Sequence, residues 1–256
     1  MIAFWTLFHR EIKRFMKVMV QTVVTPFISS FLYLLVFGVS LGGQVQTHGV
    51  PYLAFLIPGL MMMGLMNNAF QNSSSSVVTS KFSGDLEDIR VAPVTNNQII
   101  WAFSLGSLFR GSIVATVTFT CGALFYYFQR HEFIGIQHPL ILIYFMVVGG
   151  LLFGQLGICV AFWARTFDQL SAFSAFILLP LTYLGGVFIS VESLGPFWQA
   201  VSRLNPLLYL INGLRYGLLG VSDVELNQAM LISFVGLVFF YLMSQWALRK
   251  GSFQRW

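Results

Sequence analysis

The segment that decides the fold class is a nearly continuous apolar run, Phe27-Ile28 followed after two serines by Phe31-Leu32-Tyr33-Leu34-Leu35-Val36-Phe37. Strands of a membrane β-barrel alternate apolar and polar residues, and this run does not. Lipid provides no hydrogen-bond partners for the backbone, so a chain that crosses it forms either helices or a closed barrel. The run therefore predicts a membrane-spanning α-helix.

The composition of the whole chain supports the same class of protein. Of its 256 residues, 57% are hydrophobic and 9% are charged, and the mean hydropathy is +0.77. With 14 Lys and Arg residues and 9 Asp and Glu residues, the chain has too few charges to cover the surface of a water-soluble globule. We therefore expect lipid to surround most of the chain.

A helix needs roughly 20 apolar residues to cross the hydrocarbon core. Six segments meet this requirement, at residues 20–41, 52–78, 111–128, 139–164, 170–189 and 229–248. The apolar segment 207–221 is shorter and is interrupted by Asn212 and Arg215, so we predict a re-entrant or interfacial helix there. The predicted fold is an all-α membrane protein, a single transmembrane domain over residues 1–256 with six transmembrane helices.

The distribution of basic residues predicts the orientation. With six spans, both termini lie on one side, which carries Arg10, Lys13, Arg14, Lys17, Lys81, Arg90, Arg165, Arg249, Lys250 and Arg255. The opposite side carries only Arg130, Arg203 and Arg215, and Arg110 falls at the inner edge of the third span, where it can reach lipid phosphates. The positive-inside rule then places both termini in the cytoplasm. Membrane lipids account for the net charge of +5 without a nucleic-acid partner.

Residues 1–19 predict an amphipathic helix that lies in the membrane interface. Its basic face consists of Arg10, Lys13, Arg14 and Lys17, at helical spacing i, i+3, i+4 and i+7. Aromatic and apolar residues, among them Phe4, Phe8 and Phe15, occupy the opposite face. We expect the basic face to meet lipid headgroups. The helix either fixes the topology only or also transmits motion.

The second predicted span becomes polar in its second half. Asn67, Asn68, Gln71 and Asn72 are followed by four serines at residues 73–76. Either this end protrudes into the cytoplasm, or its polar groups face a cavity lined by protein, since contact with lipid would leave them unsatisfied. We expect a cavity for Asn67 and Asn68, with Gln71 as a further candidate for the lining of a transport pathway, and protrusion for the serines.

The joint at residues 81–93 predicts a short helix. Ser83 can cap it, Asp85 and Glu87 suit the positive end of its dipole, and Pro93 stops it. Leu86, Ile89 and Arg90 share one face at spacing i, i+3 and i+4. An apolar spine with acidic flanks suits insertion into a groove of another protein. The alternative is a solvated loop.

Several motifs resemble the permeases of the ABC-2 type, whose relatives include exporters of nodulation factors and polysaccharides. They are Phe167-Asp168, Pro180-Leu181-Thr182-Tyr183-Leu184-Gly185-Gly186-Val187-Phe188, Leu204-Asn205-Pro206 and Gly213-Leu214-Arg215-Tyr216-Gly217. Leu86-Glu87-Asp88 with Val91-Ala92-Pro93 looks like the first coupling helix of that family, which sits in a cleft of an ATPase. The resemblance implies a coupling contact formed by Asp85, Leu86, Glu87, Ile89, Arg90 and Pro93. It also implies re-entrant outer helices between the fifth and sixth spans, at residues 190–225.

The same resemblance implies an assembly of two permease chains with two separate ABC ATPase subunits in a bacterial inner membrane. ATP and Mg would be bound by the ATPase, so no cofactor is expected on this chain, and we expect no catalytic or metal site. The cargo would be amphipathic or apolar, such as a lipid, a glycolipid or polysaccharide, or a drug. Arg165 and Asp168 form either a second cytoplasmic contact with the ATPase or a solvated turn.

Two observations on the sequence favour an ATP-driven exporter. No phosphate-binding loop of the form G-x-x-x-x-G-K-[ST] occurs in the sequence, so ATP hydrolysis requires another subunit. The alternative is an ion-coupled secondary transporter, which generally needs an ionisable group deep in the membrane. All 9 acidic residues fall outside the cores of the six predicted spans. A passive channel would need a selectivity filter, and no such segment is visible.

Overall fold

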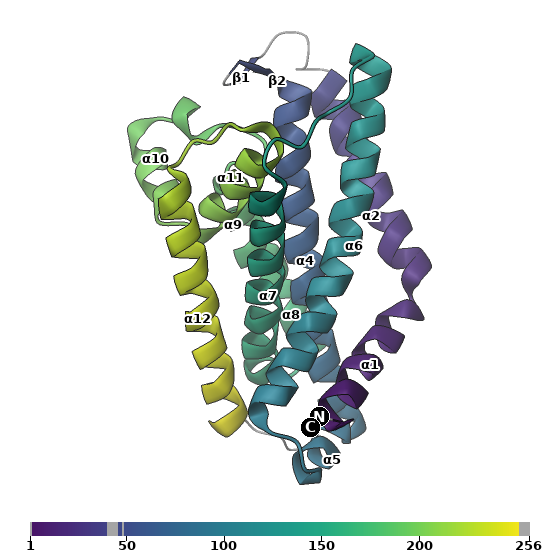
Figure 1. Cartoon of the computed structure of the whole chain (residues 1–256). Coiled ribbons are helices and arrows are strands. Elements are labelled where there is room, and N and C mark those ends of the chain that lie inside the picture. Colours follow the sequence, from purple (N-terminus) through teal and green to yellow (C-terminus); the bar gives the residue numbers. More distant parts are fainter. Residues whose placement is uncertain (1, 40–45, 48, 251–256) are drawn as a thin grey trace.

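The computed structural model describes residues 2–39, 46–47 and 49–250, apart from the side chains of residues 39, 46, 47 and 90. Its elements form a helical bundle with one two-stranded antiparallel pair, β1 to β2 (Figure 1). In chain order they are α1 (Ile2–Met16), α2 (Met19–Tyr33), η1 (Leu34–Val39), β1 (Gln46–Thr47), β2 (Val50–Pro51), α4 (Tyr52–Ser83), α5 (Asp85–Val91), α6 (Asn96–Arg130), α7 (Pro139–Trp163), α8 (Phe167–Phe173), η2 (Ser174–Leu178), α9 (Leu179–Leu184), η3 (Val191–Ser193), α10 (Pro196–Arg203), α11 (Pro206–Leu219) and α12 (Leu226–Lys250).

Six helices are long and apolar enough to cross a membrane, which confirms the predicted number of spans. They are Met19–Gly38, Tyr52–Ser83, Asn96–Arg130, Pro139–Trp163, Phe167–Leu184 and Leu226–Lys250. The start of α1, α5 and the end of α12 lie together at one end of the bundle, which we call the α5 end (Figure 1). The β1–β2 pair and α10 lie at the opposite end, which we call the hairpin end. The end of the first predicted span, at residues 40–41, lies outside the described residues.

The third span begins earlier than the predicted residue 111. Thr95 and Gln98 form a capping box, in which the Gln98 amide donates to Thr95 Oγ1 (3.3 Å) and the Thr95 amide donates to Gln98 Oε1 (3.0 Å). This cap satisfies the free amide groups at the helix start, so α6 extends from Asn96. Arg110 therefore lies within the helix, 14 positions (110 minus 96) after its first residue.

The fifth span is interrupted by a π-helical segment, η2. The span begins at Phe167, the first residue of α8, where the Thr166 side chain accepts a hydrogen bond from the Gln169 amide (3.3 Å). Pro180 has no amide hydrogen to donate to the preceding turn, and η2 lies in that turn. The helix ends before Gly186, whose φ of 83° reverses the chain. The span therefore covers Phe167–Leu184 and not the predicted residues 170–189.

Helix α4 forms the centre of the bundle and packs against α6, α7 and α11. In the most apolar stretch of α4, 78% of the residues are buried inside the protein. The corresponding share is 17% for the first span, Met19–Gly38, and 17% for the fifth, Phe167–Leu184. Glycines permit the close approach of α7: a Cβ at Gly157 would lie 2.6 Å from the Phe70 carbonyl oxygen of α4, and one at Gly154 would lie 3.1 Å from Ser107 Cβ of α6. These glycines serve packing within one chain.

The region at residues 190–225 contains η3, α10 and α11 at the hairpin end. Arg215 of α11, predicted as an outer charge, is fully buried. Its guanidinium donates to the Gly186 carbonyl (2.7 Å) and to Asn212 Oδ1 (3.0 Å), lies 3.7 Å from the Phe55 ring centroid, and pairs with Asp223 at 3.9 Å. Arg215 thus joins α11 to α4 and to the chain that follows α9.

We predict that Gly157→Ala lowers the midpoint of thermal unfolding in detergent by several degrees. The added methyl group meets the α4 backbone, and overpacking of this kind costs about 1–3 kcal/mol. Gly135→Ala is the control, because a Cβ there would meet nothing within 4 Å. Equal midpoints for the two variants would contradict the close packing of α7 on α4.

Candidate functional site

Helix α5 begins directly after α4, and a glycine makes the change of direction possible. Gly84 has φ of 83°, which a glycine adopts without strain. The N-cap position of α5 is Gly84, and Ser83, the last residue of α4, accepts a long hydrogen bond at Oγ from the Asp85 amide (3.5 Å). Ser83 thus contacts the first amide of α5 as predicted, but from the residue before the N-cap. The acidic residues Asp85, Glu87 and Asp88 lie in the first turn, as the helix dipole favours.

The apolar face of α5 points toward the chain's own core. Leu86 is 1% exposed and Ile89 is 7% exposed, and both belong to the main hydrophobic cluster. This corrects the prediction that they insert into a partner: the bundle itself covers them. Asp85, Glu87, Asp88, Val91 and Pro93 are exposed instead, and the side chain of Arg90 lies outside the described residues.

The turn between α7 and α8 lies beside the α4–α5 joint. Lys81 Nζ donates to the carbonyls of Ala161 (2.7 Å) and Phe162 (3.2 Å), at the C-terminal end of α7. The rings of Phe82 and Phe167 stack with centroids 5.9 Å apart. Arg165 and Asp168 are exposed on this turn, so the two predicted contact segments form one surface. We call it the α5 surface: Asp85, Glu87, Asp88, Val91, Arg165 and Asp168.

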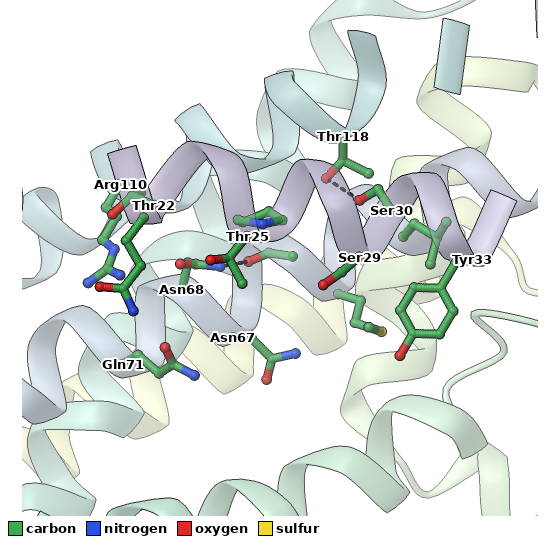
Figure 2. A pocket seen from close by; sticks show the side chains of 15 residues that line it. Thr22, Thr25, Ser29, Ser30, Tyr33, Asn67, Asn68, Gln71, Arg110 and Thr118 are labelled. Carbon is green, nitrogen blue, oxygen red and sulfur yellow. Dashed lines mark hydrogen bonds between the residues drawn. The ribbon is translucent and has the colours of Figure 1, made fainter. Parts of the chain in front are cut away.

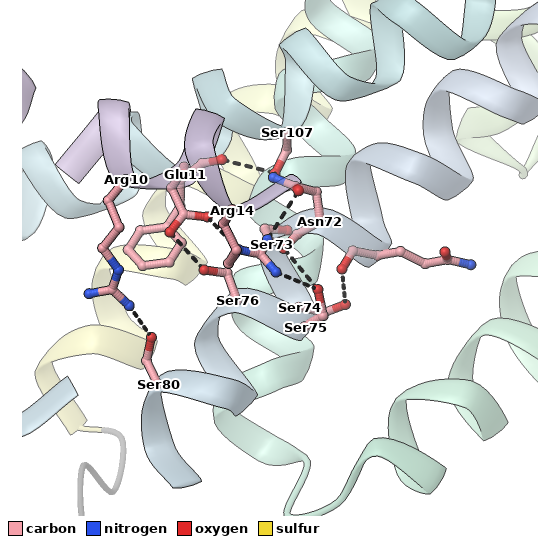
Figure 3. A network of polar contacts seen from close by, with 12 residues as sticks. Arg10, Glu11, Arg14, Asn72, Ser73, Ser74, Ser75, Ser76, Ser80 and Ser107 are labelled. Atoms are coloured by element: carbon pink, nitrogen blue, oxygen red, sulfur yellow. Dashed lines mark hydrogen bonds and ion pairs between the residues drawn. The ribbon is translucent and has the colours of Figure 1, made fainter. Parts of the chain in front are cut away.

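The predicted basic face of α1 is divided between solvent and protein. Lys13 and Lys17 are exposed, whereas Arg10 and Arg14 turn toward α4 (Figure 3). Arg10 donates to Ser80 Oγ (2.6 Å) and lies 3.7 Å from the Asp85 carboxylate of α5. Arg14 donates to the carbonyl (2.6 Å) and Oδ1 (3.0 Å) of Asn72. Helix α1 is therefore fastened to α4 and reaches α5.

The serines after Asn72 are enclosed by protein, which corrects the prediction that they protrude. Ser73, Ser74 and Ser76 are buried. Ser76 donates to Glu11 Oε1 of α1 (2.8 Å), and Arg14 lies 3.4 Å from the same carboxylate (Figure 3). Burial raises the pKa of Glu11, and the nearby Arg14 opposes this rise. Helices α6 and α7 pack on α4, and Glu11 of α1 accepts from Ser76, so Ser73, Ser74 and Ser76 are enclosed.

A polar cavity of about 270 Å³ lies between α2, α4 and α6 (Figure 2). The predicted pathway residues Asn67, Asn68 and Gln71 all line it. The remaining polar lining comes from Gln21, Thr22, Thr25, Ser29, Ser30, Tyr33, Arg110 and Thr118. Ser30 and Thr118 are hydrogen-bonded at 3.1 Å, and Asn68 donates to the Gly64 carbonyl at 3.0 Å. The cavity lies at the middle of α4, the most buried helix.

Two further cavities share lining residues with this one. A cavity of about 280 Å³ between α4, α6 and α8 shares Gln71 and Arg110 and extends to Phe167 and Ser174. An aromatic cavity of about 260 Å³ also contains Tyr33 in its lining, together with Phe37, Tyr183, Phe188 and Ile189. We call the three together the cavity chain. It passes from a polar part near α8 to an aromatic part near the hairpin end.

Sequence reasoning missed the contribution of α2 and Arg110 to this cavity. Thr22, Thr25, Ser29 and Tyr33 follow at spacings of three and four residues, which places them on one helical face. This polar stripe within an apolar span was the available signal. Arg110 was assigned to the membrane edge because the start of α6 was placed too late.

Comparison with known proteins gives the same family as the sequence motifs. The family model described as "ABC-2 type transporter" matches residues 2–219, most of the chain. The chain belongs to the ABC-2 type transporter family. The inner membrane transport permease YadH of Escherichia coli K12 is 38% identical over 251 residues, which cover 98% of this chain and 96% of that protein.

More distant relatives of this ABC-2 permease carry other names. Nodulation protein J of Neorhizobium galegae is 26% identical over 93% of this chain and 89% of its own. The daunorubicin resistance permease protein DrrB1 of Streptomyces coeruleorubidus is 24% identical over 84% of this chain and 74% of its own. The chain is thus a transmembrane, non-catalytic subunit of an ABC transporter, similar to an inner membrane permease, and the family implies a partner ATPase.

We predict that Leu86→Ala with Ile89→Ala loosens α5 from the permease itself. Each truncation of a buried Leu or Ile side chain costs about 2–5 kcal/mol. Amide hydrogen exchange at residues 85–91 should become faster in the purified permease without any ATPase present.

Val91→Ala is the control for this double variant, because Val91 is 89% exposed and its truncation should leave exchange unchanged. Unchanged exchange in the double variant would show that these side chains do not hold α5 to the bundle.

Proposed function

We propose that this chain is the membrane half of an ATP-driven exporter and that its ATPase binds at the α5 surface. Two permease chains pair with two ATPase subunits, both termini are cytoplasmic, and the cargo is amphipathic or apolar, in the class of lipids, glycolipids or polysaccharides, and drugs. The observation that carries the proposal is the arrangement of α5: its apolar residues are held by the bundle, and its acidic side is exposed.

The construction of α5 suits the transfer of force between two proteins. Leu86 and Ile89 fasten the helix to the core, and burial of each side chain contributes about 1.5–3 kcal/mol. Lys81 joins the end of α4 to the end of α7, and Arg10 joins α1 to Asp85. A movement imposed on α5 by an ATPase would therefore reach α1, α4 and α7 together.

The cavity chain supports the transport part of the proposal. Polar residues such as Asn67 and Asn68 at the middle of a membrane helix are costly unless they face a cavity or protein. The cavity chain also has an aromatic part, where Phe188 lies 5.4 Å from Tyr33 and 5.2 Å from Phe37 between ring centroids. A polar part followed by an aromatic part suits an amphipathic molecule.

The same arrangement supports a pair of permease chains. The cavity chain lies between α4 and two helical segments, α2 and α8–α9. These two segments have little protein around them, because only 17% of the residues in the apolar stretch of each span are buried. A second copy placed against these helices would complete the wall of the pathway. Lipid contact by Lys13 and Lys17 of α1 remains part of this proposal.

An ion-coupled secondary transporter is the alternative, and the buried acids bear on it. The side chains of Glu11 and Asp223 are buried, but each is paired with an arginine, Arg14 and Arg215 respectively. Among the described residues that line the cavity chain there is no Asp or Glu. Proton coupling in such a pathway generally uses an ionisable residue, so this lining favours the ATP-driven exporter.

We predict that Glu87→Lys with Asp88→Lys weakens co-purification of the ATPase about tenfold or more, since reversed charges at an interface oppose complementary ones. Both side chains are exposed, so the thermal midpoint of the permease should not change. The matched control is Glu132→Lys, an exposed acid in the connection between α6 and α7, away from the α5 surface. Full ATPase binding by the double variant would exclude the α5 surface as the contact.

We predict a cytoplasmic α5 end from cysteine labelling in intact cells. An impermeant maleimide should label Ala200→Cys on α10, and it should label Ser83→Cys only after the cells are permeabilised. Both positions are exposed, whereas the native Cys121 and Cys159 are buried and give little background. The reverse labelling pattern would invert the proposed orientation.

A further inference from the structure

We propose that Arg110 binds an anionic group of the transported molecule, at the point where the two polar cavities meet. This proposal rests on the proposed transport function and names the chemistry of the cargo at that site. The ligand chemistry is a phosphate or carboxylate group that can accept several hydrogen bonds. It would be carried by an amphiphile whose apolar part extends toward Tyr33 and Phe188.

Arg110 lies deep along the bundle. It follows Asn96, the first residue of α6, by 14 positions (110 minus 96), which is about 21 Å along the helix at 1.5 Å per residue. It lines the cavity between α2, α4 and α6 and also the cavity between α4, α6 and α8. A ligand in either cavity therefore has access to Arg110 (Figure 2).

The guanidinium has hydrogen-bonding capacity to spare. Its Nε is buried and has no hydrogen-bond partner among the described residues. No Asp or Glu lines either of the two cavities that it shares. A half-buried cation without a counter-charge is costly, and a bidentate anion is the ligand that best matches its planar donors.

The charged groups around the site leave an excess of positive charge. Arg14 of α1 is near enough to interact electrostatically with Arg110. The nearby carboxylate is that of Glu11 of α1, which packs closely against Gly106 of α6. A Cβ added at Gly106 would lie only 2.8 Å from the Cβ of Glu11. Glu11 already accepts from Ser76 and pairs with Arg14. The charges that act on Glu11 are those of Arg14 and Arg10, so Glu11 does not compensate Arg110, and an additional anion would be attracted there.

The remaining lining supplies neutral donors around the proposed anion. Gln71 lines both cavities with Arg110, and Asn67 and Thr22 line the cavity between α2, α4 and α6. The Thr22 hydroxyl is buried and has no hydrogen-bond partner among the described residues. Hydroxyl and amide donors beside an arginine suit a phosphate or carboxylate that carries further polar substituents.

The test measures binding to the permease alone, without its ATPase, by thermal stability in nanodiscs of phosphatidylcholine. The probes are lysophosphatidic acid, lysophosphatidylcholine of the same acyl chain, and inorganic phosphate. We expect saturable stabilisation by lysophosphatidic acid and little by lysophosphatidylcholine, whose choline group neutralises the phosphate. Arg110→Gln should weaken the apparent affinity for lysophosphatidic acid about tenfold or more, and Arg110→Lys should retain part of it.

Arg130→Gln is the matched control, an exposed arginine at the end of the same helix, and should behave as the natural chain does. Stabilisation by lysophosphatidic acid alone assigns the site to an anionic amphiphile. Equal stabilisation by inorganic phosphate, lost in Arg110→Gln, assigns it to a free anion and overturns the amphiphile. Equal responses of Arg110→Gln and the natural chain overturn the site altogether. Because no ATPase is present, each result is independent of the α5 surface.

Discussion

The close packing of α7 and α6 on α4 is the constraint on which the rest of the structure depends. Helices in lipid gain little from the hydrophobic effect between them, so close contact and buried polar groups hold them together. The contact of Gly157 with α4 brings the two backbones within reach, and Glu11, Asn72 and Ser76 then find partners inside the protein. Without that approach, the polar half of α4 would meet lipid.

One continuous helix connects the two functional regions. The middle of α4 lines the polar cavity, and its end carries Lys81, the Gly84 joint and α5. Lys81 binds the last carbonyls of α7, and Arg10 spans from α1 to Ser80 and Asp85. Under the proposed function, a displacement of α5 would act on the cavity through α4, which is packed on most of its surface.

The sequence predicted the helical class, the six spans, the short helix after the second span and the polar residues that line a cavity. These features depend on local patterns of apolar length and periodicity, which the structure retains. The start of α6 was predicted too late, and the Thr95–Gln98 cap shows that the helix already begins at Asn96. The amphipathic pattern of α5 indicated that Leu86 and Ile89 are covered, but a pattern cannot tell whether the partner or the chain itself covers them. The serines look solvent-exposed in sequence, yet Ser73 bonds the Ala69 carbonyl of its own helix (3.3 Å) and needs no water.

The measurement that tests this account most directly is the reactivity of a cysteine at Gln71 in the assembled permease–ATPase complex. Gln71 lines both polar cavities and is exposed, and the native cysteines are buried. Maleimide labelling rates would be compared without nucleotide and with a non-hydrolysable ATP analogue. The account predicts that the analogue changes the rate at Gln71→Cys several-fold and leaves the rate at Ala200→Cys unchanged. Identical rates at Gln71→Cys in the two states would contradict the coupling of α5 to the cavity through α4.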